Sequence, residues 1–448
     1  MHTQLLIIGA GPGGYETALL AARRGLDVTI VEKGAVGGTC LNEGCIPTKA
    51  LCRTAEILSM LSDAEKFGVK NVSYAFDFPA AMARKDAVVE QLRGGVESLL
   101  ANPKIRLVRG EARFVEARTV EVDGERYEAD DVIIAVGSVP AMLPIEGCDL
   151  PEVLTSREIL SLDVLPKRLC IVGGGVIGLE FASVFDAFGC EVTVLEYAKE
   201  VLPHFDTELA KRLRQLLGRR GIAIETQAEV TGIAKDGDGV HVAYRRKGKE
   251  CVADADMVLM AVGRKANVTA LNLADAGIEF TPKGIKVDEM MQTNVPHVYA
   301  VGDVNGQLML AHAAIFQGMR ALNHIMGRAE GDGLRLDIVP AAVFTMPETA
   351  SVGMTEDECR ERGIAHECKK AFFRANGKAV ALGETDGFCK LITSGNTLLG
   401  CHVCGPHAAD VVQEACALIA SGATLDDLKH VVHAHPTVGE ILQSVAHS

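Results

Sequence analysis

Short apolar runs that lead into glycine-rich turns recur along the chain and predict strands that feed into helices. The run from Leu5 to Ile8 enters a turn at Gly9 to Gly14, and residues Thr17 to Arg23 favour a helix. A second apolar run, Val28 to Val31, ends in Glu32. Runs that are apolar on both faces are typical of strands buried in a parallel sheet. This stretch therefore predicts a strand-helix-strand unit.

The same order returns further along the chain. Leu169 to Val172 enters a turn at Gly173 to Gly178, a helix is expected from Glu180 to Phe188, and Val192 to Leu195 ends in Glu196. The acid follows the last glycine of its turn by 18 residues in both copies, 32 − 14 and 196 − 178. A single glycine turn can be merely tight, but two copies in equal register predict two dinucleotide folds.

Each glycine position has a mechanical role in such a fold. The first allows the tight turn, the second admits a pyrophosphate at the helix N-terminus, and the third lets the helix pack on the strand. The glycines at these positions are Gly9, Gly11 and Gly14 in the first copy and Gly173, Gly175 and Gly178 in the second. The acid that follows accepts hydrogen bonds from a ribose diol and repels a 2′-phosphate, so Glu196 favours NAD over NADP.

The remainder of the chain suggests four parts and an α/β fold class. Apolar runs at Phe388 to Ile392 and Thr397 to Val403 flank a turn, and Ala408 to Ala420 has one apolar face, as expected for an α+β domain. We expect two Rossmann-like nucleotide domains followed by this C-terminal domain. The predicted parts are 1–142 (first nucleotide domain), 143–265 (second nucleotide domain), 266–335 and 336–448, of which the last is the α+β domain.

The segment from Gly37 to Lys49 carries two cysteines, Cys40 and Cys45, where a glycine-rich loop is expected to become a helix. Pro47 suits a first helical turn, and the free N–H groups there would lower the pKa of Cys45 below its usual value of about 8.5. On a regular helix the two side chains would diverge, so a bond between them requires a break at Gly44. We predict a redox pair; the alternative is two buried structural thiols.

A histidine and a glutamate near the end of the chain form a candidate acid-base pair. If Pro436 opens a helix, His435 lies just outside it and Glu440 lies about one turn inside. The carboxylate would then orient the imidazole and raise its pKa, although an ordinary surface histidine is an open alternative. No metal site is predicted: His430, His433 and His435 lack a zinc spacing, and Cys401 and Cys404 would point to opposite faces of a strand.

Composition narrows the classes of function. The chain has 448 residues, 48% of them hydrophobic, a net charge of −14 and 13 cysteines. The charge disfavours nucleic acid and anionic membranes as partners, and the basic run Arg245 to Lys249 is expected to be a hairpin turn. No apolar run is long enough to span a bilayer, and Leu5 to Ile8 leaves no room for a signal peptide. An odd cysteine count without framework spacing favours a reducing, cytoplasmic location.

With these motifs in order along the whole chain, the sequence resembles the flavin-dependent pyridine nucleotide-disulfide oxidoreductases. The redox segment is the most specific signature, and Val298 to Asp303 is a further match. Within the family, the chain looks most like the members that oxidise dihydrolipoamide with NAD. The resemblance implies FAD in the first nucleotide fold, NAD in the second and a homodimer. It also implies that 266–335 returns to the first domain and that 336–448 is the interface domain.

The resemblance also implies roles for single residues. Cys45 would lie beside the flavin, Cys40 would exchange with the substrate, and His435 with Glu440 would supply the base to the partner subunit's site. The residues implied in cofactor binding, besides the six glycines, are Glu32, Lys49, Asp303 and Ala311 for FAD, and Glu180, Glu196 and Gly263 for NAD, with Glu180 paired to Lys49.

Two alternatives and one departure stay open. The rivals are a reductase of another disulfide or of mercuric ion, and a flavin-binding scaffold without turnover. The residues after His312, Ala313 to Gly318, replace a lysine and an acid-rich stretch that the dehydrogenases commonly carry, which bears on the substrate. The implied partners are dihydrolipoamide or a lipoyl domain, within a complex of the 2-oxoacid dehydrogenase or glycine cleavage type.

Overall fold

The computed structural model describes residues 1–237, 239–269, 271–328 and 332–448. These residues group into two compact units, each built from separate stretches of chain. The first unit contains Met1–Ala50, Ala80–Ala141 and Gly263–Leu336, and the second contains Leu51–Pro79, Met142–Val262 and Asp337–Ser448. The chain thus leaves the first unit and returns to it twice. The division into four functional parts stays a prediction.

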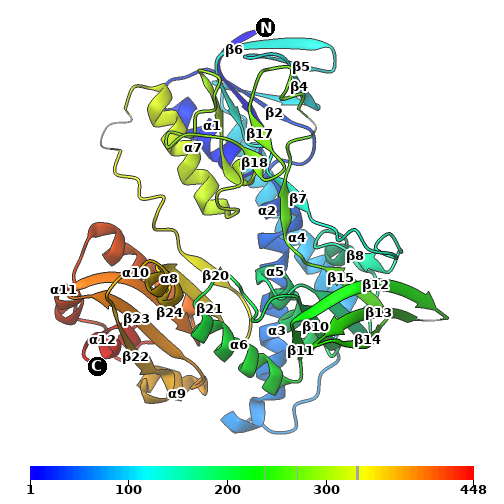
Figure 1. Cartoon of the computed structure of the whole chain (residues 1–448), viewed down its shortest axis with the longest axis vertical. Helices are drawn as coiled ribbons and strands as arrows, with labels where there is room; N and C mark the ends of the chain where they lie inside the picture. The colour runs from blue at the N-terminus through cyan, green and yellow to red at the C-terminus, as the bar shows by residue number, and fades with distance from the viewer. Residues whose placement is uncertain (238, 270, 329–331) are drawn as a thin grey trace. The chain divides into compact units, whose positions relative to one another are not determined.

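A largely parallel sheet forms the centre of the first unit. Its strand order is β3-β2-β1-β6-β5-β4, with β19 also paired to β6. The parallel strands are β1 (His2–Ile8), β2 (Val28–Glu32), β3 (Ile105–Arg109), β6 (Glu125–Ile134) and β19 (Val298–Ala300), and the antiparallel ones are β4 (Ala112–Glu116) and β5 (Thr119–Val122). Helices α1 (Pro12–Arg23) and α7 (Ala311–Ile325) pack against each other beside this sheet (Figure 1). The predicted strand-helix-strand unit is confirmed.

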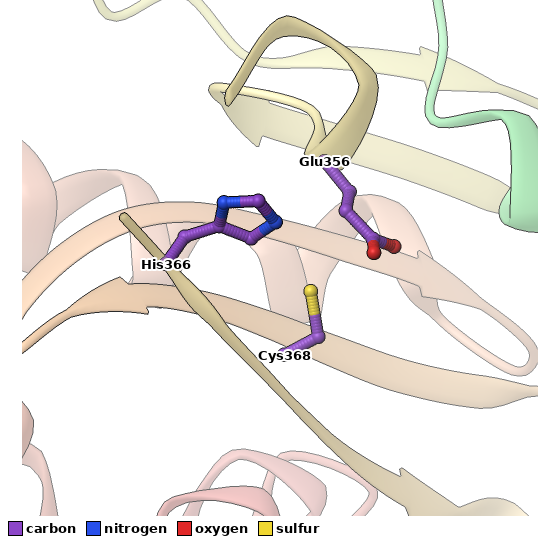
Figure 2. A group of neighbouring side chains, drawn as sticks. All are labelled: Glu356, His366 and Cys368. Atoms are coloured by element: carbon purple, nitrogen blue, oxygen red, sulfur yellow. The ribbon is translucent and has the colours of Figure 1, made fainter. Parts of the chain in front are cut away.

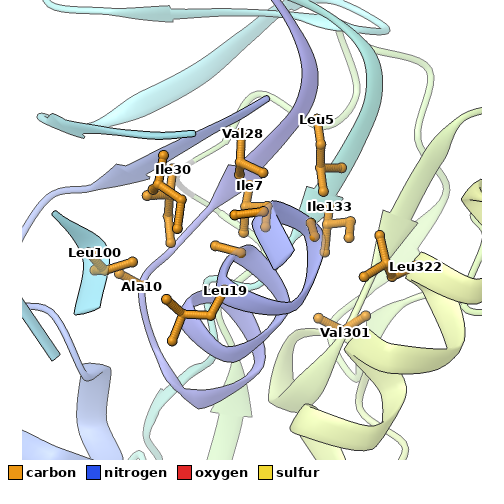
Figure 3. Close-up of a cluster of buried hydrophobic side chains, with 14 of the residues drawn as sticks. Leu5, Ile7, Ala10, Leu19, Val28, Ile30, Leu100, Ile133, Val301 and Leu322 are labelled. Atoms are coloured by element: carbon orange, nitrogen blue, oxygen red, sulfur yellow. The ribbon is translucent and has the colours of Figure 1, made fainter. Parts of the chain in front are cut away.

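The core of this unit lies between the sheet and α1. Leu5, Ile7 and Ile30 have no exposed surface, and their side chains gather with Leu19 of α1 (Figure 3). Because both faces of β1 are covered, Leu6 and Leu5 are equally buried, which explains the continuous apolar run in the sequence.

The second unit contains the second nucleotide fold. Its sheet has the order β11-β10-β9-β15-β8, and all its pairings are parallel. The strands are β8 (Val153–Leu154), β9 (Arg168–Val172), β10 (Glu191–Glu196), β11 (Ala223–Thr226) and β15 (Met257–Met260), with helices α5 (Val176–Ala187) and α6 (Thr207–Arg220). The α5 helix ends one residue before the predicted Phe188, which is its C-cap.

A separate antiparallel sheet is inserted in the chain between β11 and β15 of the nucleotide fold. It consists of β12 (Ala228–Asp236), β13 (Gly239–Arg246) and β14 (Lys249–Ala255). Lys247 and Gly248 connect β13 to β14, and both have positive φ, as a two-residue hairpin turn requires. The interpretation of this basic run as a hairpin turn is therefore confirmed.

The C-terminal part of the second unit is an antiparallel sheet with helices. Its strand order is β20-β21-β24-β23-β22. The strands are β20 (Ala341–Val343), β21 (Thr349–Gly353), β22 (Glu367–Phe372), β23 (Phe388–Ser394) and β24 (Thr397–Cys404), and the helices are α8 (Glu356–Glu361), α9 (Gly377–Leu382), α10 (Ala408–Ser421), α11 (Leu425–His430) and α12 (Glu440–Ala446). The predicted strand pair and the predicted apolar-faced helix are confirmed. Together with the two nucleotide folds, this part confirms the α/β class with an α+β C-terminal domain.

The remaining elements connect these sheets. The helices are α2 (Gly38–Glu43), α3 (Cys45–Ser62) and α4 (Phe78–Leu100), and the short strands are β7 (Ser138–Pro140), β16 (Arg264–Ala266), β17 (Phe280–Thr281) and β18 (Gly284–Ile285). None of the described helices combines the length and the apolar surface that crossing a bilayer requires.

Candidate active site

The two cysteines of the redox segment lie on two successive helices. Cys40 is on α2 and Cys45 is the first residue of α3. Gly44 separates the helices with φ −151° and ψ −108°, a conformation that interrupts a regular helix. The prediction that Gly44 interrupts the helix and that Cys45 lies at a helix start is confirmed. The expectation that Cys40 lies in a loop is wrong, because α2 is a short helix of six residues.

The redox segment packs directly on the first glycine turn. The N–H of Gly37 donates to the carbonyl oxygen of Ala10 at 2.7 Å. A Cβ on Gly38 would lie only 2.7 Å from the Cα of Gly11, and Gly38 has a φ of 58°. A side chain at either glycine would separate the two loops, so glycine here fixes the dithiol beside the first nucleotide turn.

Cys40 and Cys45 are in the thiol form, and their side chains are hydrogen-bonded to each other. This contact, with burial, raises the pKa of the Cys40 thiol, while the positive charge of Lys49 opposes the rise. Cys45 is exposed and Cys40 is half-buried. The contact with Cys45 and the burial therefore favour the protonated form of Cys40. The lowered pKa predicted for Cys45 stays a prediction.

The first glycine turn is held by close backbone contacts. Gly9 has a φ of 101°, and a Cβ on it would lie 2.5 Å from the carbonyl oxygen of Ala135. A Cβ on Gly14 would lie 1.9 Å from the carbonyl oxygen of Gly9. Glu32 accepts the N–H of Ala10 at 2.7 Å and that of Gly34 at 2.7 Å. Each carboxylate oxygen keeps a second lone pair, which is what a ribose hydroxyl would need.

The second glycine turn repeats this construction. Gly173 has a φ of 111°, and a Cβ on Gly178 would lie 2.0 Å from its carbonyl oxygen. A Cβ on Gly175 would instead enter open space at the start of α5. Buried Glu196 accepts the N–H of Gly174 at 2.5 Å and that of Ala198 at 2.6 Å. The two glycines therefore differ as the motif requires. The second, Gly175, leaves room for a ligand, and the third, Gly178, is needed for packing.

A hydrogen-bonded group around half-buried Asp303 was only partly predicted from the sequence. The Ser138 hydroxyl donates to Asp303 at 2.5 Å, and Arg264 donates to the Ser138 hydroxyl at 2.6 Å and to its carbonyl oxygen at 2.8 Å. Burial lowers the pKa of Arg264, although Asp303 opposes this. Arg264 and Ser138 were missed. Their signal was the pair of matching Val-Gly sequences at Val136 and Val262, which the structure joins by pairing β7 with β16.

The departure after His312 has a structural function in the first unit. The side-chain oxygen of Gln317 accepts the N–H of Gly302 at 2.7 Å and the amide of Asn305 at 2.9 Å. A Cβ on Gly318 would lie 1.9 Å from the Thr17 hydroxyl, so this glycine allows α7 to approach α1. Ala311 is the first residue of α7. Helix α7 thereby fixes the segment that carries Asp303.

Three further predicted residues occupy defined places. Lys49 lies in the part of α3 that belongs to the first unit, and Gly263, with a φ of 113°, begins the last stretch of that unit. Glu180 of α5 lies in the second unit, where it is buried and accepts the N–H of Phe344 at 3.0 Å. The pairing of Lys49 with Glu180 stays a prediction.

The histidine and the glutamate near the C-terminus are in contact. His435 Nδ1 lies 2.9 Å from Glu440 Oε1, and the N–H of Thr437 donates to Glu440 Oε2 at 2.7 Å. These two hydrogen bonds lower the pKa of Glu440, and the one from Thr437 has the larger effect. The His435 side chain is 79% exposed, so its Nε2 is accessible to another molecule. The expectation that Pro436 opens the helix is wrong: α12 begins at Glu440, which reaches back to His435 across the intervening turn.

The histidines of the two metal sites that sequence reasoning disfavoured form hydrogen bonds within the chain. His402 is fully buried, with Nδ1 bonded to the Ser351 hydroxyl and Nε2 to the carbonyl oxygen of Met354. His433 lies 3.0 Å from Glu414, whereas His435 bonds Glu440. These three histidines are therefore held by three different sets of partners.

Comparison with known proteins decides what this arrangement belongs to. Residues 3–318 match the pyridine nucleotide-disulphide oxidoreductase family, and residues 339–446 match the dimerisation domain of the same family. The chain belongs to this family. It is a flavoprotein oxidoreductase with two nucleotide folds and a C-terminal dimerisation domain.

Individual members of the family are similar over the whole chain. The dihydrolipoyl dehydrogenases of Geobacillus stearothermophilus and Bacillus subtilis are 40% and 41% identical, with 100% of this chain and 96% of each relative covered. That of Chlamydia muridarum is 38% identical over 97% of this chain and 94% of the relative. The structure of the HOCl-induced flavoprotein disulfide reductase RclA from Escherichia coli is similar with a TM-score of 0.88 and 29% identity, covering 99% of both chains.

Proposed function

We propose that the chain oxidises dihydrolipoamide to lipoamide through Cys40 and Cys45, with FAD as resident cofactor and NAD as the final acceptor. The observation that carries this proposal is the hydrogen-bonded dithiol at the start of α3, packed on the first glycine turn. Its choice of substrate is supported by the dihydrolipoyl dehydrogenases that are about 40% identical over the whole chain. The sequence alone suggested the same activity.

The residues of the two glycine turns suit dinucleotides. In the first fold, FAD would be held by Gly9, Gly11, Gly14, Glu32, Lys49, Asp303 and Ala311, and in the second, NAD by Gly173, Gly175, Gly178, Glu180, Glu196 and Gly263. The open space at Gly175 and the free N–H groups at the start of α5 fit a pyrophosphate. Bound FAD and NAD would supply the two-electron chemistry that carries reducing equivalents away from the dithiol.

The chain's own residues would perform the thiol exchange. His435 takes a proton from one substrate thiol, and the resulting thiolate attacks Cys40 Sγ in the Cys40–Cys45 disulfide, releasing the Cys45 thiolate. The second substrate thiol then attacks the mixed disulfide and releases Cys40, so that the substrate leaves as a cyclic disulfide. The dithiol form of the chain is the product of these steps. FAD bound beside Cys45 would cover that sulfur and leave Cys40 as the one that exchanges.

We propose a homodimer in which His435 of the partner subunit completes each site. The match to the family's dimerisation domain over residues 339–446 supports this assembly, and the exposure of His435 suits a role outside its own subunit. The substrate would be free dihydrolipoamide or a lipoyl domain of a 2-oxoacid dehydrogenase or glycine cleavage complex. We place the reaction in the cytoplasm, where a dithiol is kept reduced.

A reductase that runs toward another disulfide or mercuric ion is the second candidate. It is favoured by the similarity to RclA, a flavoprotein disulfide reductase, and by the altered residues from Ala313 to Gly318. The altered residues, however, have a structural function, since Gln317 anchors the turn at Gly302. Because this role is structural, the altered residues do not by themselves indicate a different substrate.

A substrate panel tests the proposal. The FAD-loaded enzyme is assayed with dihydrolipoamide and NAD, dihydrolipoamide and NADP, and NADH or NADPH with lipoamide, glutathione disulfide or mercuric ion. We expect dihydrolipoamide with NAD to have the highest kcat/KM, and NAD to be preferred over NADP because Glu196 repels a 2′-phosphate. A higher kcat/KM for glutathione disulfide or mercuric ion would overturn the dehydrogenase assignment.

A further inference from the structure

Three side chains with different donor atoms converge on the C-terminal sheet, and none of them belongs to the dithiol or to the glycine turns. Glu356 is the first residue of α8, His366 precedes β22, and Cys368 lies within β22. One oxygen, nitrogen or sulfur atom from each lies within 4.8 Å of the other two (Figure 2). All three residues are half-buried, so the group is accessible from solvent.

The imidazole is already oriented as a ligand. His366 Nδ1 lies 2.8 Å from the carbonyl oxygen of Ile364, an acceptor, so Nδ1 carries the ring proton. The lone pair is therefore on Nε2, which points toward Glu356 and Cys368 in Figure 2. Metal-binding histidines are commonly fixed by such a backbone hydrogen bond on the other nitrogen.

The thiol is protonated until something displaces its proton. Burial and the nearby carboxylate of Glu356 raise the pKa of Cys368 to about 11, with burial the larger cause. The positive charge of Lys390 opposes this rise. The thiol is also hydrogen-bonded to Glu356. A borderline-soft cation that bonds sulfur can displace this proton to solvent, whereas Mg²⁺ does not favour sulfur.

A neighbouring lysine does not prevent a cation from binding. Lys390 Nζ lies 2.5 Å from Glu356, but it also contacts both oxygens of Asp206, at 3.1 and 3.0 Å, and Glu208 at 3.2 Å. If Glu356 turned one oxygen to a metal, Lys390 would keep two carboxylate partners. The charge of Lys390 would therefore stay neutralised by Asp206 and Glu208 while Glu356 bound the metal.

We propose that Glu356, His366 and Cys368 bind a zinc ion, with a water in the fourth position. A tetrahedral zinc with bonds of about 2.0–2.3 Å places its ligand atoms about 3.3–3.9 Å apart. Side-chain movements of about 1 Å would bring the three donors to this spacing. Binding forms a Zn–S bond at Cys368 and breaks its S–H bond, with the proton released to solvent.

Equilibrium dialysis against Zn²⁺, with excess Mg²⁺ present, tests the site. The FAD-loaded dimer is used oxidised and without reductant, so that the Cys40–Cys45 disulfide cannot act as a ligand. We expect about one zinc per chain in the unmodified protein and in Cys416→Ser, a matched control that removes another half-buried thiol of the same domain. Cys368→Ser and His366→Gln each remove a direct ligand and should weaken zinc binding by at least about 10–100-fold, the loss typical for an outer-shell partner.

The outcome is independent of the proposed activity, because the readout is bound metal. FAD content and far-ultraviolet circular dichroism verify that each variant is folded, and two separate variants are used so that misfolding of one leaves the test intact. Equal zinc binding by the unmodified protein and both site variants, or no zinc binding by the unmodified protein, would overturn the proposal. Zinc that binds without Mg²⁺ but is displaced by excess Mg²⁺ would indicate an ordinary carboxylate cluster and would also overturn the proposal.

Discussion

At the scale of single residues, the two nucleotide turns are stabilised in the same way, by a glycine and a glutamate. A glycine admits a carbonyl oxygen at contact distance, and a glutamate at the end of the second strand holds the turn by accepting backbone N–H groups. Glu32 bonds Ala10 and Gly34, and Glu196 bonds Gly174 and Ala198. Each acid therefore shapes its turn before any nucleotide arrives, which explains why the turn and acid recur at equal spacing.

The glycines of the second turn should separate effects on binding from effects on folding. In Gly178→Ala the new Cβ would lie 2.0 Å from a carbonyl oxygen, and the forced displacement should cost about 1–3 kcal/mol of stability. In Gly175→Ala the Cβ meets no protein atom, so stability should be kept while the KM for NAD rises by about tenfold, equivalent to about 1.4 kcal/mol. Thermal unfolding and steady-state kinetics of the two variants check this. Similar losses in both would contradict the assigned roles.

Glu440 is expected to act by positioning His435. In Glu440→Gln, the charge that its low pKa maintains at neutral pH is lost, and kcat/KM for dihydrolipoamide should fall by about 10²-fold, with a larger loss in His435→Gln. Exposed His430, the last residue of α11, offers the control variant His430→Gln, which should keep full activity.

The pH profile distinguishes positioning from a purely structural effect. Because the pKa of Glu440 is lowered in the folded protein, its support for the turn persists at neutral pH and is lost as pH falls through that lowered value. We expect Glu440→Gln to remove this acid-side dependence. An unchanged profile with a uniformly lower rate would argue against positioning.

At the scale of elements, one row of the C-terminal sheet is polar from strand to strand. Ser351, His402, Lys390 and Lys370 are successive cross-strand partners on β21, β24, β23 and β22. Lys390 has no exposed side-chain surface and is neutralised by the carboxylates of Asp206, which precedes α6, and Glu356, the first residue of α8. The sequence pattern shows β23 only as an apolar run, because Asp206 lies 184 residues earlier and periodicity does not report such a partner.

Removing the lysine charge should be costly and dependent on pH. Burial raises the pKa of Asp206, but His402 and Lys390 lower it more, so the pairing stabilises the fold above the unfolded pKa of about 3.9 and is lost as pH falls through the lowered value. Lys390→Met should cost about 3–5 kcal/mol at neutral pH, because it leaves buried carboxylates unpaired, and less in acid. Denaturant unfolding at both pH values measures this, with exposed Lys249→Met as control. A constant cost would contradict the charge pairing.

At the scale of the whole molecule, local signals and long-range pairings were not equally predictable. The glycine turns, the start of α3 at Cys45 and the contact of His435 with Glu440 depend on residues close in sequence, and these could be predicted. The network of Ser138, Arg264 and Asp303 could not, because it requires β7 and β16 to pair across an inserted domain. The start of α12 at Glu440 was missed because Pro436 offered a stronger local signal for a helix start.

The account depends on Cys40 and Cys45 being the thiols that gain electrons. Differential alkylation of the FAD-loaded protein, with and without stoichiometric NADH under anaerobic conditions, followed by peptide mapping, measures this directly. We predict that Cys40 and Cys45 are protected before NADH is added and become alkylated afterwards, while the other eleven of the 13 cysteines are unchanged. Unchanged labelling of Cys40 and Cys45 in protein that oxidises NADH would contradict the account.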